Sequence, residues 1–239
     1  MKKIITAIAF IALSTVSAKA ISLPNISMPD KLSITAGFAS NQSVWGASGK
    51  QKSFSESGGT ANNNDSTHGV FQESYSSQFL ELGLGKYISV GYELVPDSIS
   101  TPENVEEKHE QTSTKVSVDF NDFETTYLKL NLPGGVYVKS GIVKTDLDIK
   151  ETIASGNTYK NVSTEGTSIG FGYQRFLGDT PLGIRFETNY VELDSVKTDN
   201  GVSLTGGTSA NGGRNEITAS NLEGVTAKVA ITLTLGRNN

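Results

Sequence analysis

The segment from Val225 to Leu235, which reads VTAKVAITLTL, alternates strictly between two kinds of residue. Its odd-numbered positions are all apolar, whereas the positions between them hold Thr, Ala and one basic residue, Lys228. Successive side chains of a β-strand point to opposite faces of the sheet. The segment therefore predicts a strand with one apolar face and one face of small, mainly polar residues.

The same period of two recurs along the chain from residue 31 onward. It is found at residues 32–38, 80–84, 88–94, 114–132, 136–142, 169–173 and 184–190. With the last segment, these patterns predict eight strands. In 114–132, Phe120 shares parity with Leu128, so we expect one long strand with both residues on one face. Asp122 and Glu124 interrupt that face, so the part beyond them should project out of an apolar medium.

The connections between these strands fall into two classes that alternate along the chain. Three are short, around residues 85–86, 133–135 and 177–181, and four are long, at about 41–74, 96–113, 151–163 and 193–222. Hairpins need only about two to five connecting residues, whereas outer-membrane barrels combine tight turns at one end with long loops at the other. We therefore predict an all-β fold, an eight-stranded antiparallel up-and-down transmembrane β-barrel with short periplasmic turns and long extracellular loops.

The N-terminal residues have the features of a bacterial signal peptide. Lys2 and Lys3 precede a short apolar run, and Ala18-Lys19-Ala20 forms a cleavage site of the A-x-A type. The run is shorter than the roughly 20 apolar residues that a spanning helix needs. We predict a signal peptide at 1–20, a periplasmic lead-in at 21–30 and the barrel at 31–239, located in the bacterial cell outer membrane.

The polar face of the predicted strands carries charges of both signs. If the apolar face points to lipid, these charges fill the interior, which in an eight-stranded barrel is just wide enough for side chains. An unpaired charge at that depth is costly, so opposite signs should pair and plug the barrel. We expect Arg185 and Lys228 to neutralise carboxylates, with Glu187 and Glu93 as the leading partners. The complete predicted network is Glu81, Glu93, Lys129, Lys139, Arg185, Glu187 and Lys228.

Aromatic residues lie near both ends of the predicted strands. Aromatic side chains, Tyr above all, are enriched at membrane interfaces, where the ring is in an apolar layer and a hydroxyl can reach water. We therefore predict interfacial positions for residues beside the short turns, Tyr87 and Phe176, and for residues towards the long loops, Phe38, Tyr75 and Tyr190.

Composition argues against several kinds of chemistry. The chain has 239 residues, a net charge of −5 and no cluster of Lys and Arg, so we expect no nucleic-acid partner. It has no Cys, which excludes disulfides and thiolate sites. His68 and His109 are the only imidazoles, and neither lies in a metal-ligand pattern or a nucleophile motif. We predict that the protein is not an enzyme and has no catalytic, metal or cofactor site.

With its A-x-A signal, its eight alternating strands and the final strand at 225–235, the chain resembles the eight-stranded outer-membrane barrels of the opacity-protein and outer-membrane-protein-A-like transmembrane group. The resemblance covers residues 31–236, but the chain ends in Leu235-Gly236-Arg237-Asn238-Asn239 without a terminal aromatic residue. It implies a monomer whose partners are outer-membrane lipid, lipopolysaccharide, and the barrel-assembly and periplasmic chaperone machinery.

These features favour a structural, surface-exposed protein whose interior is plugged by charged side chains. A narrow porin-like channel for small solutes is the main alternative, because the group also includes conduits. Two more distant alternatives are a lipid A-modifying enzyme and a soluble, secreted, lipocalin-like binder, in which the apolar face would point inward.

Overall fold

This computed structural model describes residues 32–54, 61–108, 112–152, 159–201 and 214–236. The predicted signal peptide at 1–20 and lead-in at 21–30 lie outside this part of the chain. Within the described residues, no helix has both the length and the apolar character needed to cross a membrane.

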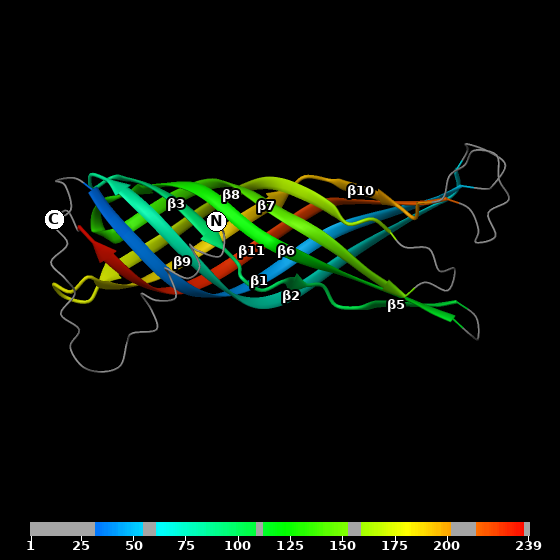
Figure 1. Cartoon of the computed structure of the whole chain (residues 1–239), viewed down its shortest axis with the longest axis horizontal. Helices are drawn as coiled ribbons and strands as arrows, with labels where there is room; N and C mark the ends of the chain where they lie inside the picture. The colour runs from blue at the N-terminus through cyan, green and yellow to red at the C-terminus, as the bar shows by residue number, and fades with distance from the viewer. Residues whose placement is uncertain (1–31, 55–60, 109–111, 153–158, 202–213, 237–239) are drawn as a thin grey trace.

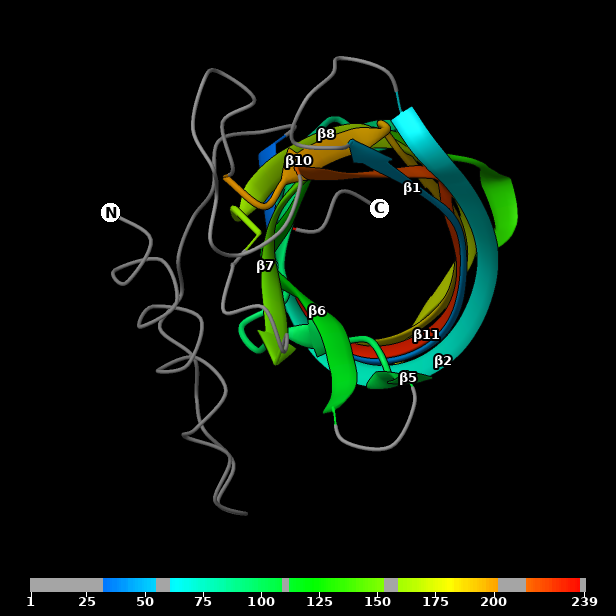
Figure 2. The ribbon, with the colours of Figure 1, turned by 90° about the vertical axis from the view of Figure 1, so that its right-hand side faces the viewer.

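Eight strands form a closed antiparallel ring, and Figure 2 shows the view along this ring. Each of them pairs with the next along the chain, and the last pairs with the first, so that the ring has no open seam there. The strands are β1 (Leu32–Phe54), β2 (Ala61–Leu84), β3 (Ile88–Leu94), β6 (Thr112–Asn131), β7 (Val136–Thr152), β8 (Val162–Phe176), β9 (Leu182–Leu193) and β11 (Asn215–Leu235).

Three further short strands lie beside the ring strands. β4 (Ile99–Ser100) and β5 (Asn104–Lys108) pair with β6, and β10 (Val196–Asp199) pairs with β11. A 3-10 turn, η1 (Pro133–Gly135), connects β6 to β7 at the short-turn end. Gly134 has φ of 82° there, a conformation that glycine adopts without steric cost.

Parts of the long connections are strand rather than loop. β1 runs to Phe54 and β2 begins at Ala61, with Ser53 paired to Asn63, although we expected a connection over 41–74. Figure 1 shows β1, β2 and β11 continuing past the ring, away from the short turns. Because polar residues lie on both faces of these extensions, their sequence does not show the alternation that predicts a strand. Backbone hydrogen bonds nevertheless pair the extended strands.

The outer surface of the ring is apolar and its inner surface is polar near the short turns. On β2, Leu80 and Leu82 are 44 % and 46 % exposed, whereas Glu81 between them is 2 % exposed. A water-soluble barrel would bury these leucines, so the exposed row faces lipid. We call this surface the lipid-facing band. At the long-connection end, the outward rows become charged at Glu124, Lys144, Glu165, Glu192 and Glu223.

One strand changes face partway along its length. β6 has a register shift between Asn121 and Glu124, where Asp122 has φ of 49°. The bulge reverses the parity, so Phe120 is 5 % exposed and faces inward, whereas Leu128 is 47 % exposed and faces lipid. The expectation of one strand is confirmed, but the expectation that both residues share a face was wrong, because an inserted residue flips a strand.

Interior glycines make room for aromatic rings on neighbouring strands. A Cβ atom on Gly172 would lie 2.3 Å from Cζ of Tyr137, and one on Gly91 would lie 2.3 Å from Cζ of Tyr127. β7 and β8 place Tyr137 directly opposite Gly172. A glycine is therefore required at each position for the ring to lie flat against the wall.

Gly172→Ala should lower the thermal unfolding midpoint in detergent, because the added methyl group forces the Tyr137 ring to move. Overpacking of this kind typically costs about 1–3 kcal/mol. Gly69→Ala is the matched control, since Gly69 is also in a strand but has open space at its Cβ position. Equal midpoints for the two variants would show that the rings are not held against the wall.

Candidate functional site

The interior near the short turns is built around a buried guanidinium. Arg185 on β9 is 1 % exposed, and its two terminal nitrogens donate to both oxygens of Glu81 on β2, with Nη1 to Oε1 at 2.7 Å and Nη2 to Oε2 at 2.8 Å. Lys129 Nζ lies 2.5 Å from Glu81 Oε2. Bidentate pairing fixes both partners in one plane, so this contact ties β9 to β2 across the lumen.

A second set of charges lies farther from the short turns. Lys228 Nζ is 2.5 Å from Glu93 Oε1 and 3.0 Å from Glu187 Oε1. Lys139 Nζ is 2.6 Å from Glu187 Oε1 and 3.3 Å from Glu93 Oε2. Each ammonium therefore contacts both carboxylates, and the four groups balance in charge. We call these four residues, with Arg185, Glu81 and Lys129, the ion-pair network.

Aromatic side chains complete the network. Tyr127 donates to Glu81 Oε1 at 2.8 Å, and Tyr137 donates to Glu187 Oε2 at 2.5 Å. The guanidinium carbon of Arg185 lies 4.5 Å from the centre of the Phe79 ring, and Lys139 Nζ lies 4.5 Å from that of Tyr127. With four basic groups and three carboxylates, the network has one excess positive charge, and ring faces stabilise buried cations.

The structure places all seven residues of the predicted network inside the ring, each at most 8 % exposed. Lys228 contacts the partners expected for it, Glu93 and Glu187. The carboxylate bound by Arg185 is Glu81, not either of those two. Glu81 and Arg185 are on strands that are not neighbours in the sheet, so their contact crosses the lumen and depends on barrel closure.

Beyond the network, the inward face becomes apolar. On β7 the inward row passes from Lys139 to Val143 and Leu147, and on β9 it passes from Glu187 to Val191 and Leu193. Trp45 stacks on Phe120 with ring centroids 6.0 Å apart. We call this layer the apolar cap, formed by Trp45, Val95, Ile99, Phe120, Phe123, Val143, Leu147, Val191, Leu193 and Leu222.

The apolar cap was missed from the sequence. Along the whole of each predicted strand, we assigned the alternate positions that include charged residues to the interior. We assigned the apolar positions between them to the lipid side. The signal was present, since Val143 and Leu147 share parity with Lys139. On β6 it was also obscured, because the bulge at Asp122 moves Phe120 to the inner face.

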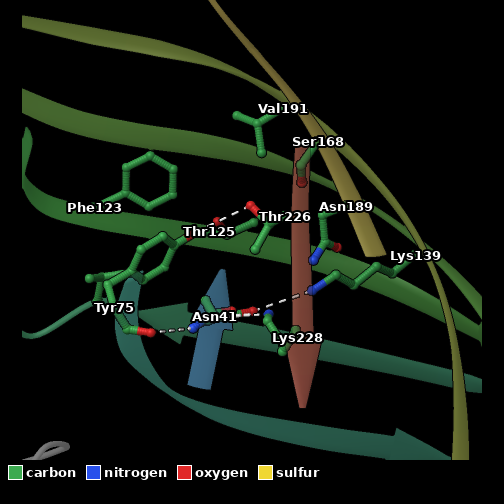
Figure 3. A pocket seen from close by; sticks show the side chains of 12 residues that line it. Asn41, Tyr75, Phe123, Thr125, Lys139, Ser168, Asn189, Val191, Thr226 and Lys228 are labelled. Carbon is green, nitrogen blue, oxygen red and sulfur yellow. Dashed lines mark hydrogen bonds and ion pairs between the residues drawn. The ribbon is translucent and has the colours of Figure 1, made fainter. Parts of the chain in front are cut away.

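A small polar cavity separates the two layers (Figure 3). It has a volume of about 30 Å³ and is lined on the network side by Asn41, Lys139 and Lys228 and on the cap side by Phe123 and Val191. Asn41 Oδ1 and Ser168 Oγ are buried here without a hydrogen-bond partner among the described residues. A polar cavity of this size has room for one or two water molecules.

One predicted interfacial aromatic residue lies elsewhere. Tyr75 faces the interior, where it lines the cavity and its hydroxyl is 3.4 Å from Thr226 Oγ1. It has the same parity on β2 as Glu81, so assigning it to the lipid side was wrong. Phe38, Tyr87 and Tyr190 are on the outer surface, 41 %, 57 % and 37 % exposed. Phe176, at the end of β8, is partly buried.

Beyond the lipid-facing band, polar pairs join the strand extensions. Burial raises the pKa of Asp119 on β6, but hydrogen bonds from Lys150 and Ser100 and the charge of Lys150 outweigh it and hold the pKa below its ordinary value. His68 Nδ1 lies 2.9 Å from Ser48 Oγ, and the two residues are directly paired on β2 and β1. His109 lies outside the described residues, among which no metal-binding group of three or more His, Cys, Asp or Glu occurs.

Comparisons with known proteins agree with this architecture. No family model and no curated protein matches the chain. Among solved structures, it is similar to the outer membrane protein OprG from Pseudomonas aeruginosa, with 11 % identity over 86 % of this chain and 96 % of that chain and a TM-score of 0.59.

Two further structures are similar at lower TM-scores. AlkL, an outer membrane protein studied in lipid bilayers, has 14 % identity over 91 % of this chain and 97 % of that chain, with a TM-score of 0.40. Ail, the attachment invasion locus protein of Yersinia pestis, has 11 % identity over 83 % and 99 %, with a TM-score of 0.38. From the closed ring, the lipid-facing band and the similarity to OprG, we conclude that the chain is an eight-stranded β-barrel protein of the bacterial outer membrane.

Proposed function

We propose that this protein is a closed, non-conducting barrel that anchors a polar surface outside the membrane, rather than a pore. The observation that carries the proposal is the succession of two unlike layers in the lumen, the ion-pair network and the apolar cap. A role as a structural or surface-exposed protein of the outer membrane follows, because the interior then offers no path for a solute.

Each layer opposes ion passage for a different reason. Conducting pores hold water-filled rings of one sign or weakly held sites that an ion can leave. In the ion-pair network, every carboxylate is already bound to a cation at 3.3 Å or less. The apolar cap offers an ion no substitute for its hydration shell, and hydrophobic constrictions close pores by excluding water.

The surface that remains available is the extension beyond the band. β1, β2 and β11 continue past the ring as a paired ribbon (Figure 1), with exposed polar side chains such as Lys50 and His68. The ion pair of Lys197 Nζ with Glu216 Oε1, 2.7 Å apart, joins the short strand β10 to β11 beside this ribbon. A polar ribbon of paired strands suits contact with the medium or with another surface. The alternative, a narrow channel for small solutes, requires both layers to open.

Arg185→Met should lower the unfolding midpoint in detergent strongly, since it leaves an incompletely paired carboxylate inside the barrel. Glu81 loses the two hydrogen bonds from Arg185 and keeps those from Lys129 and Tyr127, and each hydrogen bond to a charged group is worth about 1.5–3 kcal/mol. The exchange keeps most of the side-chain volume, so the loss reports charge rather than a cavity. Lys50→Met, at an exposed position of β1, is the control and should change the midpoint little. Equal midpoints would mean that Arg185 is solvated.

Planar-bilayer recordings test closure directly. The wild-type protein should show no steady conductance steps, and neither should variants that weaken one layer only. Trp45→Ala with Phe123→Ala thins the cap, and Glu93→Ala with Lys228→Ala removes a balanced pair but leaves Lys139 on Glu187.

The quadruple variant, which weakens both layers, should conduct. Reproducible conductance by the wild-type protein would overturn the closed-barrel proposal and favour the narrow channel. Circular dichroism of each variant shows whether it has kept the β-barrel fold.

A further inference from the structure

One carboxylate oxygen of the ion-pair network holds an amine and a carboxamide side by side. Lys139 Nζ is 2.6 Å from Glu187 Oε1, and Asn189 Nδ2 donates to the same oxygen at 2.9 Å. These two distances place the two nitrogens within 5.5 Å of each other. Lys139, Glu187 and Asn189 are 5 %, 6 % and 7 % exposed. The three side chains therefore form a set that is shielded from solvent.

The lysine and the asparagine approach each other over a glycine. Lys139 on β7 is paired with Gly170 on β8, and Gly170 is paired with Asn189 on β9. A Cβ atom on Gly170 would lie 2.3 Å from Asn189 Oδ1 and 2.9 Å from Lys139 Cγ. Figure 3 shows both side chains at the wall of the small polar cavity. A glycine on the intervening strand is therefore what allows two side chains from β7 and β9 to meet.

The ion pairs leave two requirements of this site unmet. The network has four basic groups and three carboxylates, so it carries one positive charge in excess. In addition, Asn189 Oδ1 and Ser168 Oγ are buried without a hydrogen-bond partner among the described residues. Buried excess charge and buried unpaired polar atoms both cost free energy. A reaction that removes the charge of Lys139 would leave three basic groups facing three carboxylates.

We propose that Lys139 and Asn189 form an isopeptide bond inside the folded barrel, with Glu187 as the group that moves the protons. Glu187 Oε1 takes a proton from the Lys139 ammonium, and the amine then attacks Cγ of Asn189, so that the Nζ–Cγ bond forms. Glu187 passes this proton to Nδ2 and accepts a second one from Nζ as the Cγ–Nδ2 bond breaks. Nδ2 leaves as ammonia, which takes the remaining proton from Glu187, and no group is oxidised or reduced. Lysine and asparagine side chains thus become one neutral amide, and ammonium carries the excess charge away.

The surroundings of the three side chains suit this reaction. A positioned base must lie within hydrogen-bond reach of the proton that it takes, as Glu187 does, and holding the reactants together removes the entropic cost of their encounter. Negative charge develops on Asn189 Oδ1 during the attack, and Ser168 Oγ in the same cavity is a hydroxyl that has no other described partner to donate to. The cavity of about 30 Å³ has room for the leaving ammonia. The resulting bond ties β7 to β9 across β8.

Mass spectrometry of the denatured full chain tests the bond. Protein that has folded in the outer membrane should be lighter than its sequence by about 17 Da, the mass of ammonia, whereas protein that has never folded should have the full mass. Trypsin should release residues 130–144 and 186–197 as one linked species, uncleaved after Lys139. Refolding of the full-mass protein into detergent should produce the mass loss only after the barrel has closed.

Three variants separate this chemistry from other losses of ammonia. Asn189→Leu removes the carboxamide and Glu187→Gln removes the proton acceptor, so both should have full mass and no linked species. Asn41→Leu is the matched control, because Asn41 lines the same cavity but its amide donates to Tyr75 O and Ser77 Oγ, and it should keep the link. Heat-dependent electrophoretic migration shows which variants are folded.

Three results would overturn the proposal. The first is full mass for the folded wild-type protein. The second is a mass loss confined to the 186–197 peptide, which would mean that Asn189 has cyclised on its own backbone. The third is a linked species in folded Glu187→Gln, which would exclude Glu187 as the group that moves the protons.

Discussion

The contact between Arg185 and Glu81 is the interaction on which the interior depends. A guanidinium that is 1 % exposed must have its charge met by the protein itself. Glu81 meets it with both oxygens from the far side of the lumen. This geometry exists only when β1 has paired with β11, because that pairing completes the ring around the two side chains. Charge pairing and barrel closure therefore require one another.

The rest of the interior is arranged around this requirement. Lys129 shares Glu81 with the guanidinium, so the excess positive charge of the network is placed against tyrosine and phenylalanine rings. Those rings fit because Gly91, Gly172 and Gly37 leave space on the adjoining strands. The apolar cap then covers the network on the extracellular side, which keeps water away and strengthens every charge interaction below it.

Much of the fold could be predicted from the sequence, because strand alternation is a local property. The pattern around Leu80, Glu81 and Leu82 places Glu81 on the opposite face from both leucines, and the alternation of short and long connections indicates that the leucines face lipid. Three features depend on more than local pattern. The partner of Arg185 is set by register around the whole ring, and the bulge at Asp122 inverts parity within an otherwise regular strand. In the apolar cap, the inward-facing positions of the strands hold apolar residues instead of polar ones. Their sequence therefore looks like that of lipid-facing positions.

The central claim is that the inward-facing side chains of the barrel are closed to solutes. The outward-facing side chains next to them on the same strands contact lipid. Because the chain has no native Cys, single cysteines on β8 can measure this in intact outer membranes. The account predicts that a charged thiol reagent modifies Ser163→Cys rapidly, since Ser163 is exposed beyond the band, and leaves Ser168→Cys, which lines the cavity, unmodified. Ile169→Cys should react only with a membrane-soluble reagent. Modification of Ser168→Cys at the rate of Ser163→Cys would contradict the account.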